Sequence, residues 1–175
     1  MISKKMEATL NKQIELEAYA SFLYLSMASW SDQQGMDGAA KFMLRQSSEE
    51  REHMLRIFHY INEVDGHAIT PAIKQPPKTF KSINAMLEEV YAHEQKVTKA
   101  IHKIVELCYK EDDYTTLNFL QWYIDEQREE EATMRSILDK VKLIGEGGQK
   151  LYYIDLELEK FNTVEEGQEA AESDA

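Results

Sequence analysis

The chain has 175 residues, 43% of them hydrophobic, which is enough for one domain with a sizeable core and too few for two. Its 32 acidic and 20 basic residues give a formal charge of −12, which disfavours nucleic acid and anionic membranes as partners and favours cations. Seven glycines and three prolines in the whole chain predict long helices, and therefore an all-α fold.

Two long helices are predicted in the first third of the chain. The first covers about residues 4 to 32, and its amphipathic start does not look like a secretion signal, so we expect a soluble, unsecreted protein. The second begins around Asp37, a candidate N-cap, and ends at Gly66. Each carries a hydrophobic stripe at alternating three- and four-residue steps, interrupted near its middle by Glu17 or Glu50.

A proline-containing stretch between Gly66 and Phe80 separates these helices from two more. It is too long for a tight turn, so we expect a crossover that places the second helix parallel to the third. The third helix is predicted from a Ser82 cap to about residue 109, and the fourth runs to about residue 143. Their stripes are interrupted by Glu94 and Glu130. The only cysteine, at position 108, forms no disulfide framework, and a reducing cytosol is the expected compartment.

A short fifth helix is predicted over about residues 149 to 161. Its apolar side chains, Leu151, Ile154, Leu158 and Phe161, lie at helical spacing and need a partner outside the four-helix core. Residues 165 to 175 contain too little apolar material to fold alone and are predicted to form a disordered acidic tail. We therefore expect one domain over residues 1 to 164, with the bundle at about 4 to 143.

Four glutamates near the middle of four stripes predict a layer of buried carboxylates. An isolated carboxylate in a core costs far more than one packing contact gains, so such a layer requires protons or a multivalent cation. His53 lies three residues after Glu50, on the same helical face, and favours a metal. The alternative for any one helix is a different phase, with its glutamate facing solvent.

At this point the sequence resembles a bacterial non-haem ferritin over about residues 4 to 161. The resemblance is carried by five motifs, which are Glu17-Ala-Tyr, Glu49-Glu50-x-x-His53, Tyr91-x-His-Glu94-Gln95, Asn118-Phe-Leu-Gln-Trp122-Tyr-x-x-Glu126-Gln127 and Glu129-Glu130. It implies a ferritin-like four-helix bundle with a long crossover and a short C-terminal helix.

The resemblance also implies metal ligands. Glu17, Glu50 and His53 would form a first iron site, and Glu50 would bridge to a second site completed by Glu94 and Glu130. The neutral Gln127 would lie beside this pair, so the two sites should be unequal.

Further residues match the family around this pair. Tyr24 resembles the tyrosine beside the di-iron centre, where it can hydrogen-bond a ligand or supply an electron, and an ordinary buried tyrosine is the alternative. A third iron site would use Glu49, Glu126 and Glu129 and share Glu130, although solvated glutamates on a helix flank are nearly as consistent with this spacing.

By resemblance the chain is a cytoplasmic ferroxidase that oxidises Fe(II) with O₂ or H₂O₂ and stores ferric mineral in a hollow shell of 24 copies. Arg51 stands where bacterioferritins have a haem-ligating methionine, so no haem is expected. Four alternatives remain. They are a rubrerythrin-like peroxidase, which usually adds a cysteine-rich segment, a DNA-protecting mini-ferritin with ligands from two subunits, a helical scaffold or interaction protein with protonated glutamates, and a storage cage with little oxidase activity.

Overall fold

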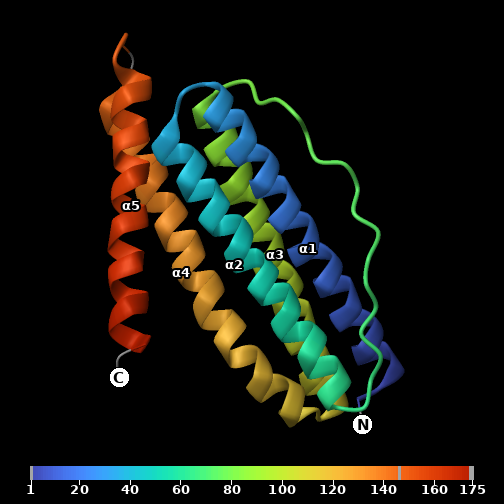
Figure 1. Cartoon of the computed structure of the whole chain (residues 1–175). Coiled ribbons are helices and arrows are strands. Elements are labelled where there is room, and N and C mark those ends of the chain that lie inside the picture. Colours follow the sequence, from blue (N-terminus) through green and yellow to red (C-terminus); the bar gives the residue numbers. More distant parts are fainter. Residues whose placement is uncertain (1, 146, 174–175) are drawn as a thin grey trace.

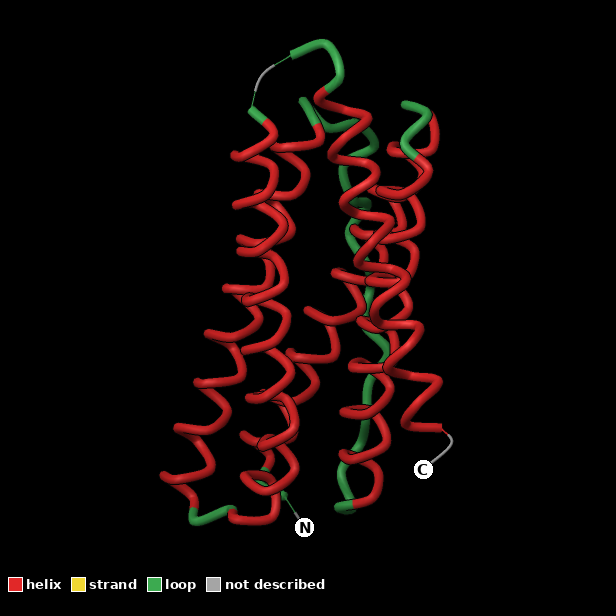
Figure 2. Tube along the Cα trace, turned by 90° about the vertical axis from the view of Figure 1, so that its left-hand side faces the viewer, coloured by secondary structure: helices red, strands yellow, loops and turns green. Residues whose placement is uncertain are grey.

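Five α-helices and no strands make up the described chain: α1 (Lys4–Gln33), α2 (Asp37–Glu63), α3 (Ile83–Glu111), α4 (Tyr114–Ile144) and α5 (Lys150–Ser173). This computed structural model describes residues 2–145 and 147–173, with side chains as far as residue 162. The pairs α1–α2 and α3–α4 are antiparallel, and residues 64–82 run the length of the bundle between them (Figures 1 and 2). The predicted four-helix bundle with a long crossover and a fifth helix is confirmed.

The helix starts are fixed by side-chain caps. The Ser82 hydroxyl accepts a hydrogen bond from the Ala85 amide, which confirms the predicted cap of α3, and Ser3 and Asp113 cap α1 and α4 in the same way. The predicted cap of α2 is wrong, because Asp37 is already helical and no side chain of the preceding residue caps the helix.

The hydrophobic core is divided into two parts by a polar layer. One part gathers around Tyr24, Met43 and Met134, and the other around Ile14, Ile57 and Ile101. Between them, on the same buried stripes, lie Glu17, Glu50, Glu94 and Glu130, each at most 8% exposed. The predicted carboxylate layer is therefore inside the bundle, and no helix is out of phase.

The fifth helix packs on its own bundle. Ile154 and Leu158 are buried in the core near α2 and α4, so the face expected to need a partner is largely covered within the chain. A Cβ on Gly38 would come within 2.3 Å of the Asp155 carbonyl oxygen, so only glycine permits this approach. Asp155 Oδ1 accepts a hydrogen bond from the Ala39 amide at 2.8 Å, which supplies α2 with the cap its own sequence lacks.

The fifth helix is longer than the predicted residues 149 to 161, because α5 is helical as far as Ser173, while the disordered acidic tail over residues 165 to 175 stays a prediction. Glutamate, glutamine and alanine, which dominate this stretch, have high helix propensities, and a helix already held by Ile154 and Leu158 needs no new nucleus to continue. Residues 174 and 175 of the predicted tail lie outside the described residues. None of the helices described has a segment both long enough and apolar enough for a membrane span.

Candidate metal centre

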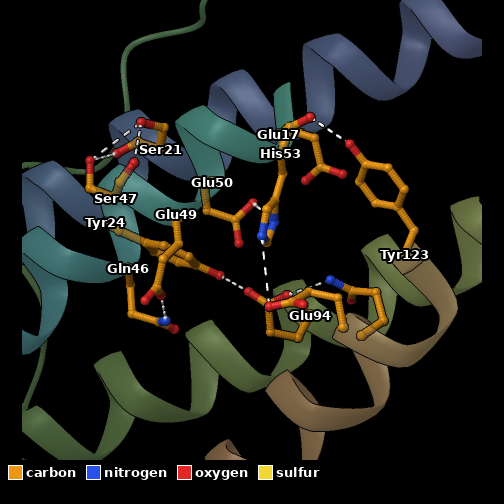
Figure 3. Close-up of polar contacts among 12 residues, drawn as sticks. Glu17, Ser21, Tyr24, Gln46, Ser47, Glu49, Glu50, His53, Glu94 and Tyr123 are labelled. Atoms are coloured by element: carbon orange, nitrogen blue, oxygen red, sulfur yellow. Dashed lines mark hydrogen bonds and ion pairs between the residues drawn. The ribbon is translucent and has the colours of Figure 1, made fainter. Parts of the chain in front are cut away.

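Glu17 and Glu50 face each other because two serines hold α1 against α2. Ser21 Oγ donates to the Ser47 carbonyl and Ser47 Oγ donates to the Ser21 carbonyl, both at 2.7 Å (Figure 3). These serines lie one helical turn from Glu17 and Glu50, respectively, and on the same faces. The small side chains let the two helices approach closely, which brings both carboxylates into one layer.

Three side chains of this layer converge on one point. One oxygen each from Glu17 and Glu50 and one ring nitrogen of His53 lie within 4.8 Å of one another, and all three residues are buried. In the described chain this is the one group of three or more histidine, cysteine or acidic residues with such geometry. Glu17 Oε2, Glu50 Oε2 and His53 Nδ1 have no hydrogen-bond partner, so three buried lone-pair groups are available to a ligand.

His53 is held in place from several directions. The Tyr123 hydroxyl donates to the His53 carbonyl oxygen at 2.6 Å, and the Trp122 ring meets the imidazole edge-on with centroids 5.2 Å apart. Burial lowers the pKa of His53 to about 4, helped by the nearby charge of Arg56. The ring is therefore neutral, and its 3.8 Å approach to Glu50 is not an ion pair. Neutral imidazole is the form that binds metals.

The other half of the layer is closed by hydrogen bonds. The Tyr24 hydroxyl donates to Glu94 Oε1, and the Gln127 amide donates to Glu94 Oε2 at 3.4 Å (Figure 3 shows the tyrosine pointing at the carboxylate). Thr98 Oγ1 lies 3.1 Å from Gln127 Oε1 and 2.7 Å from Glu131 Oε1, and its one hydroxyl proton is donated to one of these acceptors at a time. Glu94 thus has a neutral donor on each oxygen, whereas Glu17 and Glu50 each keep one oxygen free.

Burial opposes ionisation of all four carboxyls, and repulsion between carboxylates adds to this effect for Glu50, Glu94 and Glu130. Burial is the largest cause in each case, and it raises the pKa of Glu94 to about 7. The pKa of Glu17 is raised, and those of Glu50 and Glu130 are raised well above the usual range, with Glu94 the next cause for both. We call Glu17, Glu50, His53, Glu94 and Glu130 the central cluster. Its carboxylates require either protons or cations when all are buried together.

A second set of glutamates lies at the edge of this layer. Glu49, Glu126 and Glu129, named here the flank set, are partly or largely exposed. Glu49 Oε1 is 2.5 Å from the Arg45 guanidinium, and Glu129 is 3.4 Å from that of Arg128. Burial raises the pKa of Glu126, and the charges of Glu129 and Glu49 add to the rise, so the three side chains share one neighbourhood. Glu49 and Glu126 also help to raise the pKa of Glu130.

Several supporting residues were not anticipated from sequence. Gln13 donates to Glu17 Oε1 at 2.8 Å, Thr98 Oγ1 lies beside Gln127 and Glu131, and Gln46 donates to Glu49 Oε2. Gln13 and Thr98 each lie four residues from a cluster glutamate on the same helical face, so a search for polar side chains at that spacing would have found them.

The comparisons with known proteins agree with this geometry. The profile of the Ferritin-like domain matches residues 7–144. A bacterial non-heme ferritin of Campylobacter jejuni is 48% identical over 155 residues, which are 89% of this chain and 93% of that protein. One from Escherichia coli is 38% identical over 163 residues, 93% of this chain and 99% of its own length.

The fold is also similar to solved structures. A crystal structure described as a novel open pore ferritin from the hyperthermophilic archaeon Archaeoglobus fulgidus superposes with a TM-score of 0.87. It is 44% identical in sequence, and the match covers 91% of this chain and 98% of that one.

Proposed function

This chain belongs to the ferritin family, and from that premise we propose that it stores iron by oxidising Fe(II) at the central cluster. The observation that carries the proposal is the convergence of Glu17, Glu50 and His53, whose potential ligand atoms lie within 4.8 Å of one another. Each of the three has a buried polar atom without a hydrogen-bond partner. Buried lone pairs left unpaired are costly, and a bound cation removes that cost.

The donor set fits ferrous ion. Carboxylate oxygens and a neutral imidazole, with no thiolate, suit Fe and its first-row neighbours. Glu17, Glu50 and His53 form the first iron site, and Glu50 bridges to a second site made with Glu94 and Glu130. The second site is weaker, because Gln127 places a neutral amide where another charged ligand would stand and engages Glu94 itself. The two irons therefore bind unequally.

The proposed reaction is a two-electron reduction of one O₂. Two Fe(II) ions each lose one electron, and O₂ takes up both electrons and two protons to give H₂O₂ and two Fe(III) ions; H₂O₂ is an alternative oxidant. Anionic ligands stabilise Fe(III) more than Fe(II), which supplies driving force. The Tyr24 hydroxyl is proposed to orient Glu94 and to be a source of an electron, because it is buried and bonded to that ligand.

A third iron site is proposed at the flank set, with Glu130 shared. Glu126 Oε1 lies 3.9 Å from His53 Nε2, so the flank set lies directly beside the central cluster. Its glutamates are partly hydrated and two of them contact arginines, so iron there would bind more weakly and exchange faster. Such a site would receive iron that leaves the central cluster.

Storage requires a hollow assembly, and we propose a shell of 24 copies in the cytoplasm. Phe22, Leu25 and Leu44 are each about half exposed on the outward faces of α1 and α2, an unusual cost for a single chain in water. Such side chains fit a contact between copies. Cys108 is buried and free, as expected in a reducing compartment.

Stopped-flow absorbance after adding Fe(II) in air tests the function. Glu50→Ala removes the bridge and should abolish rapid oxidation, whereas Glu52→Ala, an exposed glutamate on the same helix, should stay within about twofold of wild type. Equal initial rates for wild type and Glu50→Ala would refute the assignment. Size-exclusion chromatography of both variants controls for assembly.

A further inference from the structure

A threonine joins the two helices that carry the second half of the central cluster. Thr98 on α3 lies between two side chains of α4, and its hydroxyl oxygen is 3.1 Å from Gln127 Oε1 and 2.7 Å from Glu131 Oε1. Gln127 is only 2% exposed, so water does not replace a missing partner there. Neither Thr98 nor Glu131 is a metal ligand in the proposed function, which leaves the purpose of this partly buried contact to be explained.

The hydroxyl proton of Thr98 is better placed toward Glu131 than toward Gln127. A threonine has one proton to donate, and both neighbouring oxygens are acceptors. Glu131 is the nearer of the two, and a carboxylate accepts a stronger hydrogen bond than a neutral amide. Arg135 lies 3.5 Å from the other carboxylate oxygen of Glu131 and holds it in this orientation. The carbonyl oxygen of Gln127 therefore faces the Thr98 oxygen with no proton between them.

The amide of Gln127 is consequently held on one side only. Its Nε2 donates to Glu94 Oε2 at 3.4 Å, which is long for a hydrogen bond. Turning the amide by about 180° around its last side-chain bond exchanges the nitrogen and the oxygen, and that bond has a low barrier to rotation. The nitrogen then donates to Thr98 Oγ1, whose own proton stays on Glu131. The carbonyl oxygen of the turned amide faces Glu94.

A cation beside Glu94 decides between the two orientations of the amide. Without a metal, a carbonyl oxygen against Glu94 Oε2 leaves two acceptors facing each other, so the nitrogen faces the carboxyl instead. With a cation at the second site, the same carbonyl oxygen becomes an additional neutral ligand. The hydrogen bond from Thr98 to Glu131 thus matches the metal-bound orientation before any metal arrives.

We propose that Thr98 and Glu131 position Gln127 for the second iron, by accepting the amide N–H when the amide turns its carbonyl oxygen to the metal. The inference rests on the proposed function, because the second iron site belongs to it. Thr98 accepts from the turned amide and donates to Glu131, so no polar group of the amide is left unpaired. Both residues act through Gln127 and do not touch the iron.

Anaerobic equilibrium titration with Fe(II), which resolves the two binding steps, tests the role of the hydroxyl. Thr98→Val keeps nearly the same shape and leaves the turned amide without an acceptor. The second step should weaken about tenfold, as expected for one lost hydrogen bond, and the first should stay within about twofold of wild type. Thr98→Ser retains the hydroxyl and should restore the second step, which a merely structural loss would not allow.

The role of Glu131 is tested in the same titration. In Glu131→Leu the Thr98 proton has only Gln127 Oε1 to bond, which holds the amide in its metal-free orientation, so the second step should weaken several-fold. Arg135→Met breaks the ion pair of Glu131 but leaves its carboxylate in place, and the second step should stay within about twofold of wild type. Equal effects of these two substitutions would overturn the role of Glu131.

A double-mutant cycle shows whether Thr98 acts through Gln127. In a Gln127→Leu background, Thr98→Val should cause no further loss in the second step. An undiminished loss in that background, or failure of Thr98→Ser to restore binding, would overturn the inference. A wild type that binds no second Fe(II) would overturn the proposed function as well, whereas two steps that Thr98→Val leaves unchanged would overturn this inference alone.

Discussion

The central cluster and the flank set are neighbours in sequence and opposites in environment. Glu49 precedes Glu50 and Glu129 precedes Glu130, yet one member of each pair is buried in the bundle and the other reaches solvent. A step of one residue rotates a side chain by about 100° around the helix, which is enough to exchange core for water. Position around the helix, and not residue type, therefore decides which glutamates require a cation.

The two sets also differ in how much they destabilise the folded protein when no metal is bound. The central carboxyls are desolvated and crowd one another, and this raises their pKa values. In the flank set, Glu49 and Glu129 lie beside Arg45 and Arg128 and stay in contact with water. The central cluster thus stores unfavourable energy that a metal relieves, whereas the flank set has little to gain from one.

The largest expected effect is on the pH dependence of stability. The pKa of Glu94 is about 7 in the folded protein and near 4.5 in the unfolded chain. Between these values the folded state holds a proton that the unfolded state has lost, so this group makes stability fall as pH rises. In metal-free protein Glu94→Gln removes that loss, and its stability relative to wild type should grow by about 3 kcal/mol from pH 4.5 to 7.

Thermal unfolding of wild type and Glu94→Gln across this pH range measures the difference directly. Subtraction cancels the opposite trend from His53 and His93, whose lowered pKa values stabilise the fold as pH rises through about 4 to 6.5. Glu129→Gln is the exposed control and should differ from wild type by less than about 0.5 kcal/mol. A flat difference for Glu94→Gln would contradict the electrostatic account of the cluster.

A somewhat smaller effect is expected when a buried carboxylate is replaced by an apolar side chain. Glu50→Met fills similar space with a flexible, uncharged group and should stabilise metal-free protein by about 2 kcal/mol at pH 7.5. It should also lose the rise in melting temperature that wild type shows on adding Zn²⁺, a cation that undergoes no redox reaction.

Glu49→Met, the same substitution in the flank set, tests whether the effect of Glu50→Met depends on burial. Glu49→Met removes a partly exposed partner of Arg45. It should leave the response to zinc intact and should not raise the stability of the metal-free protein. Calorimetry or circular dichroism on wild type, Glu50→Met and Glu49→Met, each with and without zinc, provides the measurement. If Glu50→Met melts below wild type without metal, the central cluster stores no unfavourable energy.

The sequence was sufficient for what depends on periodicity. The four stripes placed the helices within a few residues and put Glu17, Glu50, Glu94 and Glu130 in one layer, because burial repeats with the helical turn. The sequence was not sufficient for features that depend on contacts between segments far apart in the chain. The length of α5 follows from its docking at Gly38, and a lysine-lined groove exists only because the crossover lies beside α1 and α3.

The polar support around the cluster was not predicted, although its spacing is visible in the sequence. Gln13 and Thr98 each lie four residues from a cluster glutamate, but residue type alone does not say which side chain each one contacts. The roles of the metal ligands remain predictions, because they came from resemblance to a family. The structure adds an inequality: ligand atoms of Glu17, Glu50 and His53 lie within 4.8 Å of one another, and Glu94 and Glu130 are not part of that group.

That inequality within the central cluster leads to a prediction of intermediate size. Gln127→Glu replaces a neutral amide with a carboxylate at the second site, so the second Fe(II) should be held about tenfold more tightly, or 1.4 kcal/mol. Metal-free protein should become less stable, because the hydrogen bond to Glu94 becomes a repulsion.

Anaerobic equilibrium titration with Fe(II) distinguishes the two binding steps. Arg128→Glu adds the same kind of side chain one residue away, on the exposed face, and should leave both steps unchanged. An unchanged second step in Gln127→Glu would show that position 127 does not face the second iron.

The smallest expected effect is in the flank set. Glu129→Ala removes an exposed carboxylate that is paired with Arg128, so the first oxidation of two Fe(II) per subunit should stay within about twofold of wild type. Later additions of Fe(II) should differ, because iron leaving the central cluster loses a place to bind on its way out. Sequential stopped-flow additions measure both phases. A slowed first phase in Glu129→Ala would mean that the flank set takes part in oxidation itself, and the division between buried and hydrated glutamates would then not separate their roles.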